Sequence, residues 1–356
     1  MPEYEQQLYG LIDLVVKQNA SDLHLSAGRV PTLRVDGRLV PLAKYAILTP
    51  QDMEAFVSVM LSEEKRVTLQ KEKSVDFSYS YQDMARFRVN AYYQFGNLAV
   101  AMRFIPIDIR SIEDLRLPPI LHSFSEYQQG FILITGPAGH GKSTTLAALI
   151  QEINETRTEH IITIEDPIEY IFNPERSIVD QREIGKDTLG FREALRESFR
   201  QDPDIIMLGE MRDAETMSTA ISAAETGHLI LATLHTNNAA QTIHRIIDSF
   251  PPEQQGQVRA QLALTLVGVV SQRLIPRIEG GRAPAVEVLI ANAAVRNLIR
   301  EGKIHEINMV IETNREDGMI SMNRSLANLV RQGEVSADVA ESYSLNDGEL
   351  RTLIRG

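Results

Sequence analysis

The stretch ITGPAGHGKSTT, residues 134–145, constrains the fold of this chain more than any other. It fits the pattern GxxxxGK followed by Ser or Thr: Gly136 opens the loop, and Gly141, Lys142 and Ser143 close it. The apolar run FILI precedes the loop, and apolar residues at helical spacing follow it. A strand, a glycine-rich loop and a helix in this order predict a P-loop, which binds nucleotide phosphates. A surface turn with a chance lysine is the alternative, and the two flanking elements argue against it.

The loop predicts its own ligands. Its backbone N–H groups would turn inward around the β-phosphate, and the helix N-terminus would add the positive end of its dipole. Lys142 would reach the β- and γ-phosphates, and the Ser143 hydroxyl would ligate Mg²⁺, so we expect ATP or ADP together with Mg²⁺. His140 could serve as a catalytic base, but we favour a tolerated side chain that points outward. The predicted nucleotide-binding residues of the loop are Gly136, Pro137, Ala138, Gly139, His140, Gly141, Lys142, Ser143 and Thr144.

Composition excludes several classes of protein. The chain of 356 residues is long enough for two domains, sometimes three. Its 36 basic residues against 48 acidic ones give a net charge of −12, and no block of Lys and Arg is present, so nucleic acid is a poor candidate partner. The absence of cysteine excludes disulfides and cysteine-based zinc sites. The N-terminus lacks the pattern of a signal peptide and no apolar run approaches a membrane span, so we expect a cytoplasmic protein.

The pattern of apolar residues changes along the chain. Residues 1–110 combine two helical stretches with short alternating strands, which predicts an α+β N-terminal domain. Residues 111–121, SIEDLRLPPIL, are typical of a linker because of their paired prolines. Buried-type strands alternate with helices over residues 122–290, as a parallel sheet requires, and residues 291–356 are mainly helical. The fold class predicted by these patterns is α/β.

Acidic residues follow two of the apolar strands, at the strand ends where ligands bind to open α/β sheets. Glu165, Asp166 and Glu169 follow the first; one of them could polarise water or hold Mg²⁺ through water, and a solvated acidic turn is the alternative. Glu210 follows the second, with Gly209 where a generic Walker B strand ends in Asp. We predict that Glu210 is the general base that orients water toward the γ-phosphate and helps to hold Mg²⁺, partly through water. A helix N-cap acid is the alternative for Glu210.

Two histidines flank a third apolar strand, LILATL. His228 and His235 are seven positions apart, so one continuous strand would point them to opposite faces, and we do not expect a joint metal site. His235 ends the strand and could sense the γ-phosphate. His228 precedes the strand and could either pack or act as a polar hinge.

Arginines offer charge that a neighbouring subunit could supply. Arg192, Arg196 and Arg200 recur at helical spacing on one face, and the N-terminal strands carry Arg88 and Arg103. Surface ion pairing is the default for any single arginine. We nevertheless expect an arginine finger in trans among them, with Arg196 and Arg200 as the catalytic candidates.

Four stretches together, GPAGHGKSTT, ITIEDPIEY, QDPDIIMLGEMRD and AETGHLILATLHTNNA, resemble the secretion ATPase superfamily and most closely its PilT-type pilus retraction ATPases. The likeness runs over nearly the whole chain. It implies a PAS-like N-terminal domain, a RecA-like P-loop ATPase domain and a helical C-terminal part. It also implies a homohexamer at the cytoplasmic face of the inner membrane, which hydrolyses ATP to depolymerise pilin through a membrane platform protein.

The resemblance assigns residues to the motifs of that family by position. Lys142 and Ser143 belong to Walker A and Glu210 to the Walker B end, and Arg88 and Arg103 match N-terminal arginines that approach nucleotide. The remaining assignments are Glu165, Asp166 and Glu169 to the Asp box, and His228 and His235 to the His box.

Some stretches depart from the usual family pattern. Ala138 and His140 stand where the family usually has Thr and Ser, which could alter nucleotide affinity. The stretches VSQRLIP and KIHEIN lean toward PilU-type accessory paralogues, so a paralogous retraction ATPase is a further candidate partner.

Three other functions remain open. An assembly ATPase of pili or of type II secretion usually has a longer N-terminal region and a tetracysteine motif, and this chain has neither. A nucleic-acid translocase is disfavoured by the acidic charge balance. A nucleotide-gated adaptor of another motor is the non-enzymatic alternative, and the presence of both Lys142 and Glu210 counts against it.

The stretch AAVRNLIREGKIHEI, residues 293–307, carries a prediction of its own. Val295, Leu298 and Ile299 form an apolar stripe, flanked by basic residues that begin with Arg296. We predict that the segment transmits force to a partner and takes no part in hydrolysis. The alternative is a helix packed on its own domain.

Overall fold

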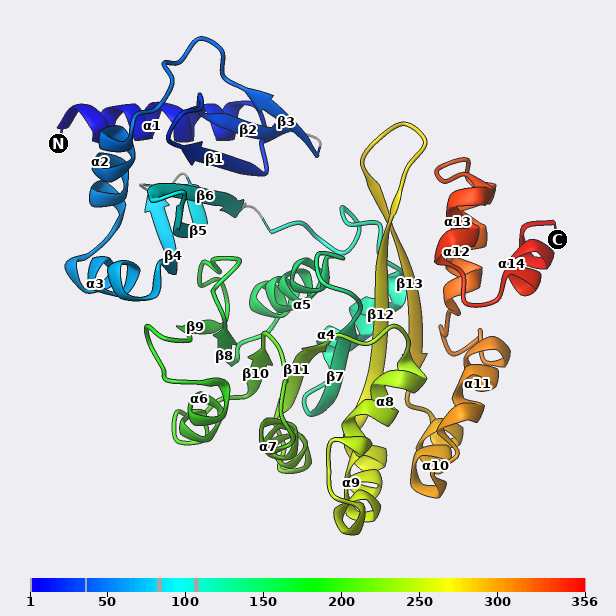
Figure 1. The fold of residues 1–356 in the computed structure, drawn as a ribbon. Coiled ribbons are helices and arrows are strands. Elements are labelled where there is room, and N and C mark those ends of the chain that lie inside the picture. Colours follow the sequence, from blue (N-terminus) through cyan, green and yellow to red (C-terminus); the bar gives the residue numbers. More distant parts are fainter. Residues whose placement is uncertain (1, 36, 82–84, 106–108, 356) are drawn as a thin grey trace. The chain divides into compact units, whose positions relative to one another are not determined.

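The computed structural model describes residues 2–35, 37–81, 85–105 and 109–355. By their internal contacts they form two compact units, one of residues 1–108 and 169–171 and the other of residues 109–168 and 172–356 (Figure 1). The first is an α+β unit and the second is an α/β unit whose C-terminal part is helical. The predicted fold class is therefore confirmed.

The first unit has one antiparallel sheet of six strands in the order β3-β2-β1-β6-β5-β4. Its helix α1 buries one apolar face, which consists of Leu8, Leu11, Ile12 and Val15. Its elements are α1 (Pro2–Lys17), β1 (Asp22–Ser26), β2 (Thr32–Val35), β3 (Arg38–Pro41), α2 (Pro50–Met60), α3 (Glu63–Glu72), β4 (Ser74–Tyr81), β5 (Ala85–Gln94) and β6 (Asn97–Ile105).

The second unit has a sheet of seven strands in the order β13-β12-β7-β11-β10-β8-β9. All neighbours are parallel except β12 and β13, which form an antiparallel hairpin. The elements up to this hairpin are η1 (Pro119–Leu121), α4 (His122–Glu126), β7 (Gly130–Thr135), α5 (Lys142–Thr156), β8 (His160–Glu165), β9 (Ile178–Glu183), α6 (Phe191–Ser198), β10 (Ile205–Leu208), α7 (Ala214–Glu225), β11 (Leu229–Leu234), α8 (Ala239–Asp248), α9 (Pro252–Thr265), β12 (Leu266–Pro276) and β13 (Arg282–Ile290).

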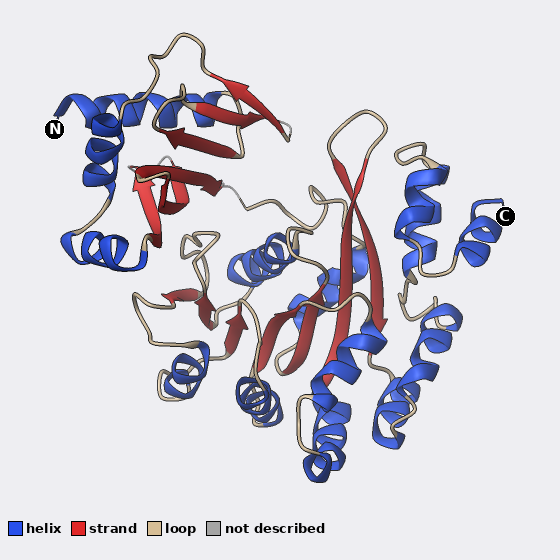
Figure 2. Ribbon diagram, viewed as in Figure 1, coloured by secondary structure: helices blue, strands red, loops and turns tan. Residues whose placement is uncertain are grey.

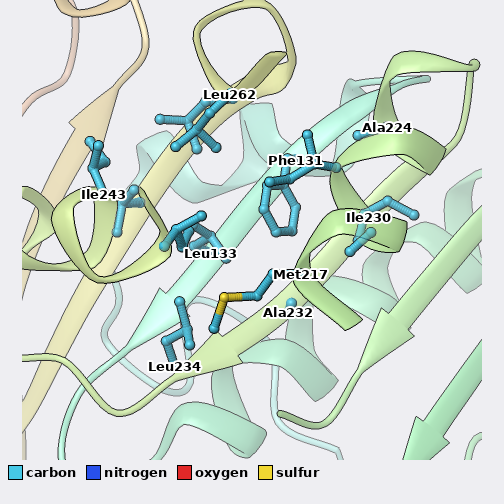
Figure 3. Packing of buried hydrophobic residues seen from close by; sticks show 14 of the residues in the cluster. Phe131, Leu133, Met217, Ala224, Ile230, Ala232, Leu234, Ile243 and Leu262 are labelled. Atoms are coloured by element: carbon cyan, nitrogen blue, oxygen red, sulfur yellow. The ribbon is translucent and has the colours of Figure 1, made fainter. Parts of the chain in front are cut away.

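Helices lie beside both faces of the central strands (Figure 2). Because successive strand residues point to opposite faces, Phe131 and Leu133 of β7 share one face with alternate residues of β11. Figure 3 shows these side chains packed against residues of α7, α8 and α9, with Met217 and Leu262 among them. The core of the second unit therefore holds β7 and β11 firmly beneath the loops that follow them.

The chain after β13 forms α10 (Ala293–Glu301), η2 (Ile304–Glu306), α11 (Ile307–Thr313), α12 (Met322–Arg331), α13 (Ala337–Tyr343) and α14 (Asp347–Arg355). Residues of α10 and α11 belong to the main core, whereas α12 to α14 form a separate apolar cluster with Ile275 and Ala285 of the hairpin. The C-terminal region thus has two parts: α10 and α11 pack on the main core, and α12 to α14 pack on the hairpin.

The segment 293–307, predicted to transmit force to a partner, packs on its own unit. Val295 and Ile299 are fully buried in the main core, so the apolar stripe packs on its own unit. Arg296 is also engaged: its guanidinium donates to the carbonyl oxygens of Ala263 and Leu264 at 2.8 and 2.6 Å, at the C-terminal end of α9. The helix-on-its-own-domain alternative therefore accounts for these residues, and only the outward side of α10 is left for a partner.

Candidate functional site

Three neighbouring strands bring the predicted catalytic residues to one edge of the sheet. In register, Thr135 at the end of β7 lies beside Leu234 of β11, and Ala232 of β11 lies beside Leu208 of β10. The P-loop, His235 and Glu210 follow these strand ends. Because β11 separates β7 from β10, His235 emerges between the P-loop and Glu210.

Lys142 is the first residue of α5 and is buried, with 8% of its surface exposed. Its Nζ donates to the carbonyl oxygens of Gly136 and Pro137 at 2.9 and 3.0 Å, and lies 3.5 Å from His235 Nδ1. The ammonium group is thus directed into the hollow of its own loop, where a P-loop receives the phosphates of a nucleotide. The strand, loop and helix predicted around residues 134–145 are confirmed.

Strand β12 forms a wall against the P-loop. A Cβ atom at Gly136, where φ is +144°, would lie 2.3 Å from the backbone oxygen of Gln272. The side chain of Gln272 accepts a hydrogen bond from Thr145 Oγ1 at 2.6 Å. The sequence analysis missed this role of Gln272, because its contacts join positions more than a hundred residues apart. The available signal was the β-branched run LVGVV with the Gly280–Gly281 turn, which together indicate a hairpin.

His140 contacts the same strand, so its predicted outward orientation is wrong. The backbone N–H of Leu274 donates to His140 Nδ1 at 3.0 Å, which requires that nitrogen to be unprotonated. Burial lowers the pKa of His140, and the positive charges of Arg282, Arg273 and Lys142 lower it further. His140 therefore works as an acceptor that fastens the loop to β12, and it is not arranged as a catalytic base.

Glu210 lies directly after β10 with 17% of its side chain exposed. Its Oε2 is 3.5 Å from His235 Nε2, while its Oε1 pairs with the guanidinium of Arg212. His235 therefore bridges Lys142 and Glu210 through its two ring nitrogens. The N-cap of α7 is Asp213, whose side chain accepts from the Thr216 N–H, so the N-cap alternative for Glu210 does not hold.

Glu165 occupies the end of β8, the strand beyond β10. It is buried, and its Oε1 accepts hydrogen bonds from Thr163 at 2.7 Å and from Gln181 at 3.2 Å. These bonds fix Glu165 to its own strand and to Gln181 of β9. Asp166 is more exposed and lies 4.0 Å from Arg212, and Glu169 falls in the segment grouped with the first unit.

His228 lies at the opposite end of β11 from His235. Its backbone oxygen accepts from the N–H of Gly130, the first residue of β7, and its Nδ1 lies 3.0 Å from the carbonyl oxygen of Ala223. The strands run parallel, so this edge is the one remote from the P-loop. His228 is therefore not brought to the nucleotide site of its own chain, and it caps the end of α7 instead.

The arginines differ in their surroundings. Arg192 pairs with Glu193 and Glu215, whereas Arg196 and Arg200 are exposed and have no ion-pair partner within the part of the chain that the structure describes. Helix α6 ends at Ser198, so Arg200 lies beyond the helical face predicted for it. Arg196 and Arg200 are thus available to another molecule.

The N-terminal arginines lie opposite each other on β5 and β6 of the first unit. Arg88 and Arg103 are directly paired in register, and both are exposed. Arg103 Nε donates to Asp22 at 3.0 Å. Their approach to a nucleotide stays a prediction.

Metal binding was tested against the same residues. Among the residues that the structure describes, no group of three or more His, Asp or Glu side chains is placed to enclose a metal ion. Mg²⁺ usually keeps several waters and binds through one or two side chains with substrate phosphates, so a site built on Ser143 fits this arrangement. The described helices include none that is long and apolar enough to cross a membrane.

Comparison with known proteins gives consistent results. The model of a family described as "Type II/IV secretion system protein" matches residues 4–280. A Pseudomonas aeruginosa protein named "Type IV pilus retractation ATPase PilT" is 44% identical over 330 residues, covering 93% of this chain and 96% of that protein. The "Type IV pilus ATPase PilU" of the same species is 40% identical over 346 residues, covering 97% and 90%.

A solved structure shows the same similarity in three dimensions. The crystal structure of the pilus retraction motor PilT with bound ADP superposes with a TM-score of 0.90 at 46% identity, covering 96% of this chain and 98% of that one. Both the fold and the arrangement of motifs along the chain are therefore those of a known group of proteins.

Proposed function

Because the chain belongs to the type II/IV secretion system protein family, we propose that it is a P-loop ATPase that powers type IV pilus retraction. The observation that carries the proposal is the line from Lys142 through His235 to Glu210 at one sheet edge, on a chain similar to retraction ATPases over nearly its full length. The reaction is hydrolysis of ATP to ADP and phosphate.

Each residue of the site has its own role in the proposed hydrolysis. The P-loop amides and Lys142 would bind the β- and γ-phosphates, and the Ser143 hydroxyl would hold Mg²⁺, which would neutralise charge on the phosphates. Lys142 would exchange its bonds to the loop carbonyls for bonds to phosphate. Glu210 accepts a proton from the attacking water, and His235 registers the presence of the γ-phosphate because it touches both Lys142 and Glu210. Glu165 holds the neighbouring strand in place.

The motor would act as a homohexameric ring in which a nucleotide bound to one subunit receives an arginine from the next. Arg196 and Arg200 support this, since they are exposed and unpaired in the described parts of the chain. Arg88 and Arg103 are the candidates from the first unit, with the joint at residues 111–121. The ring would work on an inner-membrane platform protein from the cytoplasmic side. A PilU-type accessory ATPase is the second candidate function, because similarity to PilU reaches 40% over an even longer part of the chain.

Two measurements test the proposal. The purified chain should hydrolyse ATP in a Mg²⁺-dependent reaction, and Lys142→Ala should abolish it. Deleting the gene in its own host should increase the number of surface pili while twitching motility stops. A loss of pili would indicate an assembly ATPase, and unchanged pili with unchanged motility would remove the proposed role.

A further inference from the structure

Glu287 is a buried carboxyl group that the proposed mechanism does not use. It lies on β13, next to Ser271 of β12 in register, and only 5% of its surface is exposed. A buried carboxylate needs hydrogen-bond partners to compensate for lost hydration, and the identity of those partners indicates what the group holds together.

The first amides of two helices lie at Glu287. Its Oε1 accepts from the N–H of Ala239, the first residue of α8, at 2.7 Å. The backbone N–H of Met322, the first residue of α12, lies close enough to favour the charged form of Glu287 and so to lower its pKa, and both residues line one cavity. Each helix has its own N-cap side chain, from Asn238 and Ser321, which satisfies a different amide of the first turn. Glu287 therefore lies between two helix N-termini, each of which favours a negative charge, and it is hydrogen-bonded to that of α8.

One of these helices begins at the catalytic edge. The turn 235–238 carries His235 and leads directly into α8. Thr236 Oγ1 lies 2.7 Å from Thr242 Oγ1, and Thr242 Oγ1 donates to the carbonyl oxygen of Asn238 at 2.7 Å. These bonds fix the turn to the first turn of α8, so a movement of His235 is passed to the Ala239 amide.

The other helix belongs to the C-terminal cluster. Met322 packs with Leu326 and Leu350 in the group formed by α12 to α14, separate from the main core. A displacement of the α12 N-terminus would therefore also displace α13 and α14, which pack with α12 in this cluster. The cluster packs on the hairpin through Ile275 and Ala285, so α12 to α14 form a layer distinct from the main core.

Charged groups surround Glu287 on several sides. Glu287 lines a cavity of about 200 Å³ together with Glu312 of α11 and Glu349 of α14, while α8 and α12 face it with their amides. Burial raises the pKa of Glu287 to about 7, against the opposing effects of the two amides and of Arg273 on β12. Protonation turns one carboxyl oxygen into a donor, as an amide side chain would, and weakens the hold on one of the two helices.

We propose that Glu287 is a positioning residue that couples the turn carrying His235 to helices α12 to α14, so that the state of the nucleotide site reaches the C-terminal helices. The proposal rests on the proposed ATPase function. In this proposal, a structural change caused by the γ-phosphate is transmitted through Glu287 from the nucleotide site to α12 to α14.

The first test compares ATP turnover of the wild-type chain and of Glu287→Gln as a function of pH. At pH 8 the variant should show kcat lower by about tenfold, since misplacing a group at the active site by a fraction of an ångström has effects of this order. Its affinity for ADP should remain, because Glu287 does not touch the P-loop. The ratio of the two kcat values should approach one at pH 6, where the wild-type carboxyl is itself protonated. Glu312→Gln, in the same cavity, is the matched control and should follow the wild type throughout. Equal kcat at pH 8, or a ratio that does not change with pH, would overturn the positioning role.

The second test compares amide hydrogen exchange of the chain bound to a non-hydrolysable ATP analogue with that of the chain bound to ADP, which lacks the γ-phosphate. In the wild type, exchange in both 239–248 and 322–331 should change between the two nucleotides, and in Glu287→Gln the change in 322–331 should disappear. A change in 322–331 that persists in the variant would overturn the proposal. If the variant does not fold, the exchange measured on the wild-type chain still tests the proposal. A change in exchange that is confined to 239–248 would contradict the coupling. Failure of the wild type to hydrolyse ATP would refute the proposed function, whereas the exchange experiment, which requires only nucleotide binding, would still test the coupling.

Discussion

Alanine substitutions at two glycines of the P-loop should have very different consequences. At Gly136 a Cβ atom would lie 2.3 Å from the backbone oxygen of Gln272, and φ is +144°. Contacts below 3.0 Å essentially never occur, so the two segments must separate by at least 0.7 Å, the difference between 3.0 and 2.3 Å. Strand β12 cannot yield, because β7 and β13 pair with it on its two sides. The loop must move instead.

Gly139 provides the matched control. It also has a positive φ, +76°, but a Cβ atom there would meet nothing within 4 Å. Its alanine variant therefore has only the cost of the left-handed conformation, about 1–2 kcal/mol. The Gly136 variant has this conformational cost too, and in addition its phosphate-binding amides are displaced.

Titration with a fluorescent ADP analogue measures the difference. We expect Gly139→Ala to weaken binding by about thirtyfold at most, since 1.4 kcal/mol corresponds to a factor of ten and the cost reaches about 2 kcal/mol. Gly136→Ala should weaken it by about a hundredfold or more. Circular dichroism would check that both variants fold. Equal affinities of the two variants, or wild-type affinity in Gly136→Ala, would refute the idea that β12 fixes the loop.

Three further predictions concern catalysis and force. Glu210→Gln should bind ATP but hydrolyse it about a hundredfold more slowly in a phosphate-release assay; near-normal turnover would assign the base to another acid. Mixing Lys142→Ala subunits with Arg196→Ala subunits should give activity that is non-linear in the mixing ratio if sites are shared between subunits, and a linear response would indicate self-contained sites. The exposed pair Asn297→Ala with Arg300→Ala should leave ATP turnover within about twofold of wild type while motility fails; a parallel fall of both would make the outward side of α10 structural.

The sequence allowed the central part of the site to be predicted because that part depends on local rules. A P-loop motif has a fixed conformation, and parallel strands bring their carboxyl ends to one edge, so Lys142, His235 and Glu210 could be expected together. The odd spacing of His228 and His235 predicted that they point to opposite faces of one strand; in the structure they instead flank the two ends of β11.

The contacts that could not be predicted join distant parts of the chain. The wall formed by Gln272 and the acceptor role of His140 both depend on the β12–β13 hairpin, which the sequence analysis did not identify. Arg296 was expected to belong to a basic flank for a partner, yet it donates to carbonyl oxygens at the C-terminal end of α9. Side chains as long as arginine and histidine find partners within reach, and a one-dimensional pattern does not say which partners lie there.

Imaging of labelled pili on living cells tests the central claim most directly. The strain should carry Glu210→Gln as its only copy of this gene and should lack any paralogous retraction ATPase. If ATP hydrolysis at this site powers retraction, pili should extend at the normal rate and retraction events should disappear, whereas the wild-type gene should restore them. Continued retraction in the Glu210→Gln strain, or a failure of extension in place of retraction, would contradict the account.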